Sequence, residues 1–247
     1  MKSKIYGLVG RNISYSFSVG YFTEKFTKAG LKNYTYTNFD IPTIKQLPDV
    51  IRHTKGLKGL NVTIPYKEEV LPLLDSLSKN AKLIGAVNTI AISKKGKTKG
   101  YNTDHYGFKK VLKPLLKEHH TKALILGTGG ASKAVAFALR KLKIEYDFVS
   151  RTATDVIYAY EDLNADVFRD YQIIINTTPL GTFPNMNECP PLDYTLFTKN
   201  HIAFDLVYNP EETKFLRLAK ENGATIKNGY KMLVYQAEKA WEIWNKK

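Results

Sequence analysis

The sequence has one cysteine, fewer acidic than basic residues and no long apolar run, and each shortage narrows what the protein can be. Cys189 has no partner for an internal disulfide, which favours a reducing cytoplasm. No apolar stretch approaches the roughly 18–20 residues needed to span a bilayer. The first residues also lack the apolar core of a signal peptide. These shortages argue against a disulfide-stapled scaffold and predict a cytoplasmic protein with no membrane partner.

The 37 basic residues exceed the 23 acidic ones and give a formal net charge of +14. The lysines are dispersed, and the densest group, Lys94 to Lys99 around Gly96, is typical of a hairpin tip. The sequence has neither a basic helix nor a stripe of basic and aromatic residues, so we expect no nucleic-acid partner. A dispersed positive surface favours anionic small molecules instead.

Apolar patterns alternate between strand and helix periods along the 247 residues, enough for two modest domains. The pattern predicts an α/β fold with mostly parallel sheets. The predicted strands are 5–10, 34–39, 60–63, 86–92, 123–126, 146–150, 173–176, 202–205 and 225–227. The predicted helices are 19–29, 44–53, 71–77, 106–116, 132–142, 213–222 and 231–244.

The chain is predicted to form two domains, the first of them discontinuous. A fresh strand, glycine turn and helix begin after residue 103. The last helix has an apolar face that ends in Trp241 and Trp244, and such a face must pack somewhere. If it packs on the first half, residues 1–103 and 229–247 form a substrate-binding, catalytic domain. Residues 104–228 then form a Rossmann-like dinucleotide-binding domain.

A glycine turn, Gly127-Thr-Gly129-Gly130-Ala-Ser132, follows a buried strand pattern and opens a helix of small residues. Glycines let the backbone approach a pyrophosphate, whose charge then lies at the helix N-terminus. Ser132 stands where the usual fingerprint has its third glycine. The turn therefore predicts a dinucleotide site, with a tight turn that binds no ligand as the alternative.

The end of the next strand indicates which dinucleotide binds. An NAD site usually has Asp or Glu there, whereas this strand ends in Ser150-Arg151-Thr152. A cation beside hydroxyl groups suits a 2′-phosphate, so the sequence favours NADP. The alternative is an arginine solvated at a strand end.

Polar residues also follow apolar segments in the first half. Asn61 and Thr63 share one face of a strand, and Lys67 follows where open α/β sheets bind ligands. A surface lysine is the alternative. Asn88 and Asp104 stand at similar edges; Asp104 could cap a helix, and a carboxylate near Lys67 could also take part in proton transfer.

Nine motifs occur in one order along nearly the whole chain. They are Gly10 with Ser16-Phe-Ser18, NVTIPYKEE, GAVNT, YNTD, GTGGAS, SRT, INTTPLG, DLVYNP and GYKMLVYQAE. By these motifs the chain resembles the shikimate dehydrogenases, the NADP-dependent enzymes of aromatic amino-acid biosynthesis. The resemblance implies reversible, NADPH-dependent reduction of 3-dehydroshikimate to shikimate in the shikimate pathway. The five histidines have no metal-ligand spacing, and we expect no metal.

The resemblance also implies a role for each matching residue. The catalytic pair is Lys67 and Asp104. The substrate ligands are Ser16 and Ser18 for the carboxylate, with Asn61, Thr63, Asn88, Asp104 and Gln236 for the ring hydroxyls and Tyr208 close to the substrate. The cofactor residues are Gly127, Gly129, Gly130, Ala131, Ser150, Arg151 and Thr152, with Thr177, Leu206, Gly229 and Met232 on the nicotinamide side.

The sequence departs from the family in the loop before its first helix. The family commonly has His-Ser-x-Ser-Pro there, whereas this chain has Tyr15-Ser-Phe-Ser-Val19 and keeps both serines. Those hydroxyls are equally suited to cap the helix. The competing functions are a quinate/shikimate dehydrogenase that uses NAD and a non-catalytic nucleotide-binding regulator. We expect a monomer or a homodimer.

Overall fold

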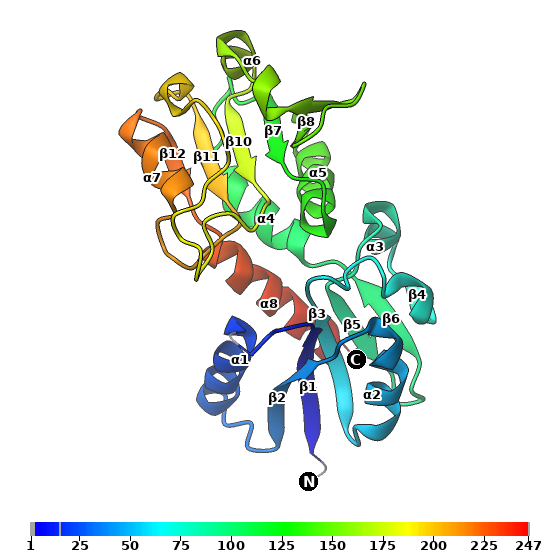
Figure 1. Cartoon of the computed structure of the whole chain (residues 1–247). Coiled ribbons are helices and arrows are strands. Elements are labelled where there is room, and N and C mark those ends of the chain that lie inside the picture. The colour runs from blue at the N-terminus through cyan, green and yellow to red at the C-terminus, as the bar shows by residue number, and fades with distance from the viewer. Residues whose placement is uncertain (1–2, 15, 247) are drawn as a thin grey trace. The chain divides into compact units, whose positions relative to one another are not determined.

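The computed structural model describes residues 3–14 and 16–246, and its internal contacts divide the chain into two units. Unit 1 comprises Met1–Thr103 with Ala237–Lys247, and unit 2 comprises Asp104–Gln236. The second boundary falls inside helix α8 (Tyr230–Asn245), drawn in red in Figure 1, rather than before residue 229. Only the later part of this helix therefore belongs to the first unit.

Unit 1 contains a mixed sheet. Strands β1 and β2 are parallel, as are β1 and β3, and helices α1 and α2 connect them. Strand β5 is antiparallel to both β3 and β6. The chain turns back between β5 and β6 at Gly96, the predicted hairpin tip. The described strands lie in the order β2 (Tyr34–Asp40), β1 (Lys4–Gly10), β3 (Leu57–Val62), β5 (Thr89–Ile92), β6 (Thr98–Tyr101) and β4 (Ser76–Leu77). The helices are α1 (Phe17–Lys28), α2 (Leu47–His53) and α3 (Lys79–Ile84), with 3₁₀ turns at Ile44–Gln46 and Leu71–Leu73.

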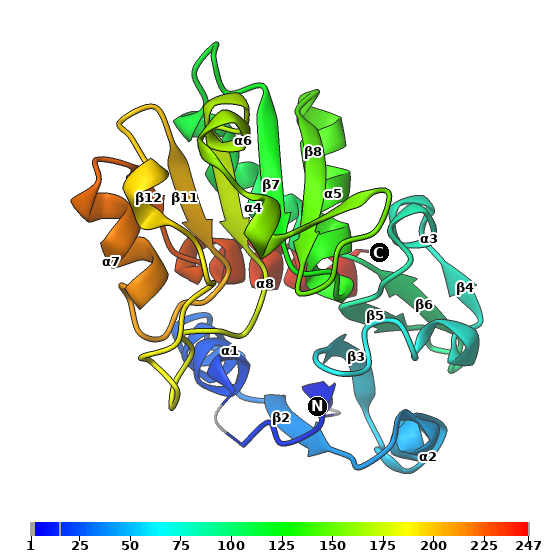
Figure 2. The same cartoon turned by 45° about the horizontal axis from the view of Figure 1, so that its top comes forward.

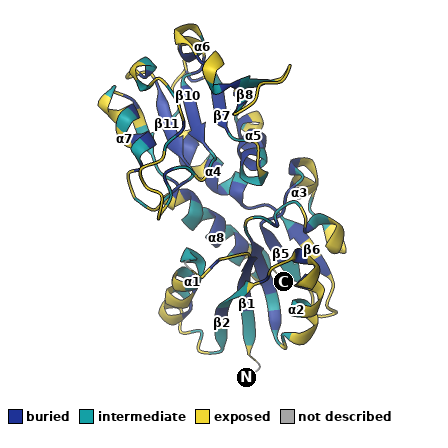
Figure 3. Cartoon of the chain, viewed as in Figure 1, coloured by how far each residue is buried: buried dark blue, intermediate teal, exposed yellow. Residues whose placement is uncertain are grey.

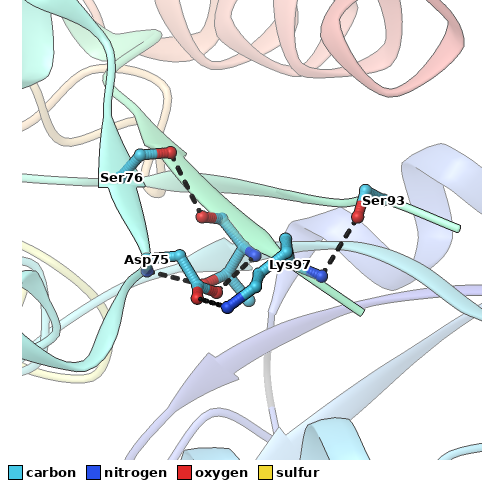
Figure 4. Close-up of polar contacts among 5 residues, drawn as sticks. Asp75, Ser76, Ser93 and Lys97 are labelled. Carbon is cyan, nitrogen blue, oxygen red and sulfur yellow. Dashed lines mark hydrogen bonds and ion pairs between the residues drawn. The ribbon is translucent and has the colours of Figure 1, made fainter. Parts of the chain in front are cut away.

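The predicted helix over residues 71–77 is wrong. The segment forms the short 3₁₀ turn and then strand β4, and α3 begins only after Ser78, whose hydroxyl caps it. The Asp75 carboxylate accepts hydrogen bonds from Thr98 N (2.8 Å) and Oγ1 (2.8 Å) and from Lys97 Nζ (2.7 Å). Figure 4 shows this clip, which ties the segment to β6 in a way that helical spacing could not reveal.

The last part of α8 completes the core of unit 1. Trp241 packs against the aromatic cluster of Tyr6, Phe22 and Phe26, and Trp244 Nε1 donates to a strand carbonyl, Ile90 O, at 2.9 Å. A Cβ at position 59 would lie 2.2 Å from Trp244 Nε1, so β3 needs glycine there. A second cluster, with Val9, Leu47 and Leu60 among its fully buried members, packs with α2.

Unit 2 contains a parallel sheet whose first strand lies near its middle (Figure 2). From β7 the chain extends outward first to β8 and β9 and then, on the other side, to β10, β11 and β12. This is the doubly wound Rossmann order. Its described strands are β12 (Thr225–Lys227), β11 (Ile202–Asp205), β10 (Ile173–Asn176), β7 (Lys122–Leu126), β8 (Glu145–Ser150) and β9 (Ile157–Ala159). Its helices are α4 (Asp104–Leu112), α5 (Gly130–Leu142), α6 (Ala165–Asp170), α7 (Lys214–Glu221) and the first part of α8, with 3₁₀ turns at Lys113–Leu115, Tyr160–Asp162 and Tyr194–Leu196.

The predicted α/β fold class is confirmed. Strands β7, β10 and β11 are almost completely buried, and they are dark blue in Figure 3. A parallel sheet covered on both faces has continuous apolar runs, the pattern from which these strands were predicted. Within residues 3–14 and 16–246, no helix is both long enough and apolar enough to cross a membrane.

Candidate active site

The predicted substrate residues of unit 1 meet at one edge of its sheet. Strands β1, β3 and β6 run in the same direction, since β6 is antiparallel to β5, which is antiparallel to β3. The two serines follow β1, Thr63 and Lys67 follow β3, and Thr103 follows β6, with Asp104 as the next residue. Asn88 comes directly before the antiparallel β5. The carboxyl edge of a sheet of this type is where ligands bind.

Ser16 and Ser18 lie at the start of α1 and are half-buried. Ser16 caps the helix, because its Oγ accepts a hydrogen bond from Ser18 N at 3.1 Å. The cap uses a lone pair of the hydroxyl and leaves its hydrogen able to donate. Capping and carboxylate binding are therefore compatible. Tyr15, between the two structured parts of this loop, lies outside the described residues.

Asn61 is 5% exposed, and three neighbours fix its amide. Its Oδ1 accepts from Tyr36 Oη at 2.8 Å. Its Nδ2 donates to Asn88 O and to Thr89 Oγ1, each at 3.2 Å. Tyr36 was not among the predicted residues; its only sequence signal was the alternation in strand YTYTNFD.

Asn88 fixes the backbone that leads to Asp104. Its Oδ1 accepts from Thr103 N at 2.6 Å, and its Nδ2 donates to Thr103 Oγ1 at 2.9 Å. Asp104 is 6% exposed and is the first residue of α4, which begins two positions earlier than predicted. A carboxylate in the first turn is favoured by the partial positive charge of the helix N-terminus.

Lys67 lies in the turn that follows β3. The turn starts at Thr63, whose N–H donates to Val9 O at 2.9 Å and whose carbonyl accepts from Tyr66 N at 2.9 Å. The Lys67 carbonyl accepts from Val87 N at 2.7 Å, and its side chain is half-buried. The backbone of the lysine is thus tied to the residue before Asn88.

Gly127 directly follows β7, the strand that lies between β8 and β10 at the switch point of the sheet in unit 2. Its φ of +103° lies in the region that favours glycine. A Cβ there would come within 3.0 Å of Thr177 Oγ1, which donates to Leu126 O at 2.6 Å. Thr177 and the glycine turn are therefore side by side, at the position where this fold binds dinucleotides.

The start of α5 is open backbone. Gly129 caps the helix with no side-chain hydrogen bond, and a Cβ added to it would meet nothing within 4 Å. Ser132, in the place of the third glycine, is 1% exposed and folds back to donate to Gly129 O at 2.6 Å. The serine leaves the helix entrance clear. The turn, with Gly130 and Ala131 in the first turn of the helix, fits a pyrophosphate.

The remaining cofactor residues follow the neighbouring strands. Ser150 ends β8 beside β7, and Arg151 and Thr152 after it are exposed. Burial raises the pKa of the Tyr160 hydroxyl, and the positive charge of Arg151 opposes that shift. Because Arg151 is exposed at this strand end, its guanidinium is accessible to a phosphate group, with which it can form charge-assisted hydrogen bonds.

The entrance to α8 is pressed against the end of β11. A Cβ on Gly229 would lie 2.1 Å from Leu206 O, and Gly229 N donates to Val207 O at 3.0 Å. Met232 is 7% exposed and packs in the core of unit 2, so only a small part of it can face a ligand. Gln236 is buried and its Nε2 donates to Leu233 O at 2.9 Å; Tyr208 follows β11 and is half-buried.

Asp205 is a buried carboxylate that sequence reasoning missed, although it opens the quoted DLVYNP motif. Its Oδ1 accepts from Asn176 Nδ2 (3.0 Å) and Val207 N (2.9 Å), and its Oδ2 accepts from Thr213 Oγ1 (2.6 Å). Burial raises the pKa of Asp205 to about 7 against these hydrogen bonds, which lower it. The network fixes the loops after β10 and β11.

The sequence relatives and several of the similar solved structures are shikimate dehydrogenases. Residues 8–90 match the model of the shikimate dehydrogenase substrate binding domain. The NADP(+) shikimate dehydrogenase of Methanococcus aeolicus is 38% identical over 98% of this chain and 92% of its own. A crystal structure of a shikimate dehydrogenase in complex with NADP+ superimposes with a TM-score of 0.86, at 36% identity over 98% of this chain and 90% of that one. The Thermus thermophilus enzyme, in complex with NADP(H) and shikimate, gives 0.86 at 32% identity over 98% and 93% of the two chains.

Proposed function

The chain belongs to the shikimate dehydrogenase family, and from this premise we propose that it catalyses the reversible, NADPH-dependent reduction of 3-dehydroshikimate to shikimate. The observation that carries the proposal is the similarity over 98% of the chain, which includes both candidate sites. The reaction belongs to aromatic amino-acid biosynthesis. Unit 1 supplies most of the substrate residues, and unit 2 supplies Asp104, Tyr208 and Gln236 together with the residues for the dinucleotide.

The residues of unit 2 suit NADP. Gly127 turns the chain while its own N–H donates to Val149 O at 2.8 Å, and Gly129 with the start of α5 offers backbone N–H groups to a pyrophosphate. Arg151 offers a cation to the 2′-phosphate. When bound, the nicotinamide supplies or accepts the hydride. The chain's own part is to hold the dinucleotide at the carboxyl edge of the parallel sheet.

Lys67 is the proposed proton donor. As hydride reaches C3 of the substrate, negative charge grows on the carbonyl oxygen, and a positioned ammonium group both stabilises that charge and protonates the oxygen. In the reverse direction the neutral amine accepts the proton from the hydroxyl group. Asp104 holds the lysine and a neighbouring hydroxyl in place. Ser16 and Ser18 bind the carboxylate, and Asn61, Thr63, Asn88 and Gln236 bind the ring hydroxyls, with Tyr208 nearby.

The direct test is absorbance at 340 nm with purified protein and shikimate, with NADP+ and NAD+ in parallel. Reduction of NADP+ alone supports the proposal. Comparable rates with NAD+ support the dual quinate/shikimate enzyme, and no reduction of either by folded protein supports a non-catalytic regulator. Arg151→Gln should raise KM for NADP+ and leave KM for NAD+ unchanged, because only NADP+ carries the 2′-phosphate.

The proposal extends to the setting of the enzyme. The single cysteine favours the cytoplasm, and fractionation of cells that produce the protein tests this location. We propose a monomer or a homodimer, which size-exclusion chromatography with light scattering distinguishes. Small molecules are the proposed partners.

A further inference from the structure

Three polar side chains project from one face of β2, an edge strand of the sheet in unit 1. Tyr36, Asn38 and Asp40 alternate along the strand and therefore share a face. Each forms a hydrogen bond to Asn61 or to the serine segment, defined as residues 11–14 and 16–18. We propose that these three side chains are positioning residues, which set the geometry of the serine segment and Asn61 for substrate. The inference rests on the proposed function and adds residues to its substrate site.

Asp40 and Asn38 hold the start of the serine segment. The Asp40 carboxylate accepts from Asn12 N at 2.9 Å and from Ile13 N at 3.0 Å. Asn12 has a φ of +57°, which belongs to the left-handed region, and the two consecutive N–H groups converge on the one carboxylate. Hydrogen bonds to an ionised acceptor are stronger than neutral ones.

The carbonyl of Ile13 links this anchor to the helix cap. It accepts from Asn38 Nδ2 at 2.9 Å and also from Ser16 N at 3.1 Å. Moving Ile13 would therefore move the residue whose hydroxyl caps α1. Asp40 and Asn38 act on the serine through this one backbone group.

Tyr36 connects the two sets of proposed substrate ligands. Its hydroxyl, on a side chain only 4% exposed, donates to Asn61 Oδ1 at 2.8 Å, and the Ser18 side chain is near enough to act against the raised pKa of the same hydroxyl. Its ring stacks on Phe22 of α1, with centroids 4.5 Å apart. Burial raises the pKa of this hydroxyl further above its ordinary value, so it stays a donor at any pH at which the enzyme works.

The side-chain amide of Asn38 is only partly hydrogen-bonded. Its Oδ1 is buried and has no hydrogen-bond partner among the residues that the structure describes. The amide turns its Nδ2 to Ile13 O, and the oxygen cannot then find a donor of its own. An unpaired buried acceptor destabilises a protein. In this orientation Asn38 holds the serine segment, but it does not add the stability that a second hydrogen bond would give.

The main test is Tyr36→Phe, which keeps the ring and its stacking and removes only the hydroxyl. We expect KM for shikimate to rise about tenfold, the effect of one ordinary hydrogen bond. We expect kcat to stay within about threefold and KM for NADP+ to stay unchanged, since ground-state binding alone is affected. Thr37→Val is the matched control, because its side chain lies on the other face of β2, and it should leave all three constants unchanged.

A second test asks whether Asp40 acts through the serines. Asp40→Ala should also raise KM for shikimate, with a smaller effect from Asp40→Asn, which keeps one acceptor oxygen. Combined with Ser18→Ala, the change in KM should be smaller than the product of the two single changes, as for residues that act as one unit. Multiplicative effects would mean that Asp40 acts independently of the serines.

The outcomes separate this inference from the function on which it rests. If the wild-type protein reduces no NADP+ with shikimate, both fail. If the wild type is active, but Tyr36→Phe and Asp40→Ala keep KM for shikimate within twofold, the positioning role alone is wrong. The positioning role is also wrong if both variants lose kcat to the same extent at saturating NADP+ while KM for shikimate is unchanged, because positioning for binding acts on KM.

Discussion

In unit 1 the candidate substrate-binding residues are fixed by hydrogen bonds from other side chains, whereas in unit 2 most of the candidate site is formed by backbone. The amide groups of Asn61 and Asn88 are each held by several side-chain hydrogen bonds. Gly127 and Gly229 instead mark places where one segment of backbone lies against another segment of the same unit. A ring with several hydroxyl groups needs donors and acceptors in fixed directions, while a pyrophosphate needs N–H groups and an open approach.

Lys67 is the proposed proton donor among the side chains of unit 1. Lys67→Ala should lower kcat by roughly 10²–10⁴, the scale of a proton-transfer group, and change KM much less. The initial rate of NADP+ reduction at saturating shikimate measures this loss. An unchanged circular dichroism spectrum shows that the variant folds, and a kcat close to the wild-type value would assign the proton to another group.

Substitutions at two glycines test whether backbone forms the candidate dinucleotide site of unit 2. Gly229→Ala puts a methyl group 2.1 Å from Leu206 O, so we expect a loss of about 1–3 kcal/mol in stability, as for overpacking, together with weaker NADP+ binding. Gly129→Ala meets no neighbour within 4 Å at a φ of −77°, so Tm should change little. KM for NADP+ should nevertheless rise about tenfold or more, because the methyl group occupies the approach of the pyrophosphate.

Gly20→Ala is the control for both glycine variants. Gly20 lies inside α1 with no atom near its Cβ, so the change should leave KM for NADP+ unchanged and raise Tm. Thermal denaturation and steady-state kinetics on the same preparations give both readouts. If Gly129→Ala binds NADP+ as tightly as the wild type, the glycine turn is a tight turn without a ligand.

Asp205 is the exception in unit 2, a side chain that fixes loops from within the core. Its folded pKa of about 7 is raised above the ordinary value of 3.8, so its contribution to stability is complete below about pH 4 and is lost as pH rises through 7. Asp205→Asn removes this titration, and Thr213 Oγ1 can turn to accept from the new amide.

Urea unfolding at pH 5.5 and pH 8 measures the effect of Asp205→Asn. The stability of the variant relative to the wild type should improve toward pH 8, by at most about 1.4 kcal/mol per pH unit. A pH-independent difference would mean that Asp205 is ionised in the folded protein throughout this range.

The Asp75 clip gives the smallest expected effect, since it lies on the surface of unit 1. Hydrogen bonds from Lys97 and Thr98 hold the pKa of Asp75 well below its usual range, so its stabilising effect is present at neutral pH and lost only in strong acid. Asp75→Asn should lower Tm slightly at pH 7 and leave activity unchanged. Lys97→Gln should lower it less, because the Thr98 N–H would keep its acceptor; equal shifts would mean that the exposed ion pair is the whole effect.

The sequence predicted the central elements better than the marginal ones. The predicted strands 173–176 and 202–205 coincide with β10 and β11, because strands that are buried on both faces have continuous apolar runs in their sequence. β4, β6, β9, α3 and α6 were missed as elements. They are short and have no clear period, and in the case of β4 a tertiary contact from Asp75 decides the conformation.

The candidate site divides in the same way. Residues expected to touch ligands could be predicted from motifs and from their places after strands, and the family resemblance is confirmed by the relatives. Tyr36 and Asp205 could not be predicted, because they act on other residues from within strands. A tyrosine or an aspartate in a strand pattern gives no sign of which distant amide or hydroxyl it will meet.

The division of α8 between the units has a consequence for synthesis on the ribosome. Unit 2 is one continuous stretch of chain, so all of its strands have emerged before α8 is complete. The aromatic cluster of unit 1 must wait for Trp241 and Trp244, which are translated after the whole of unit 2. The half of the protein that starts first is therefore the half that finishes last, and until then its exposed aromatic surface is the part of the nascent chain that most needs protection by a chaperone.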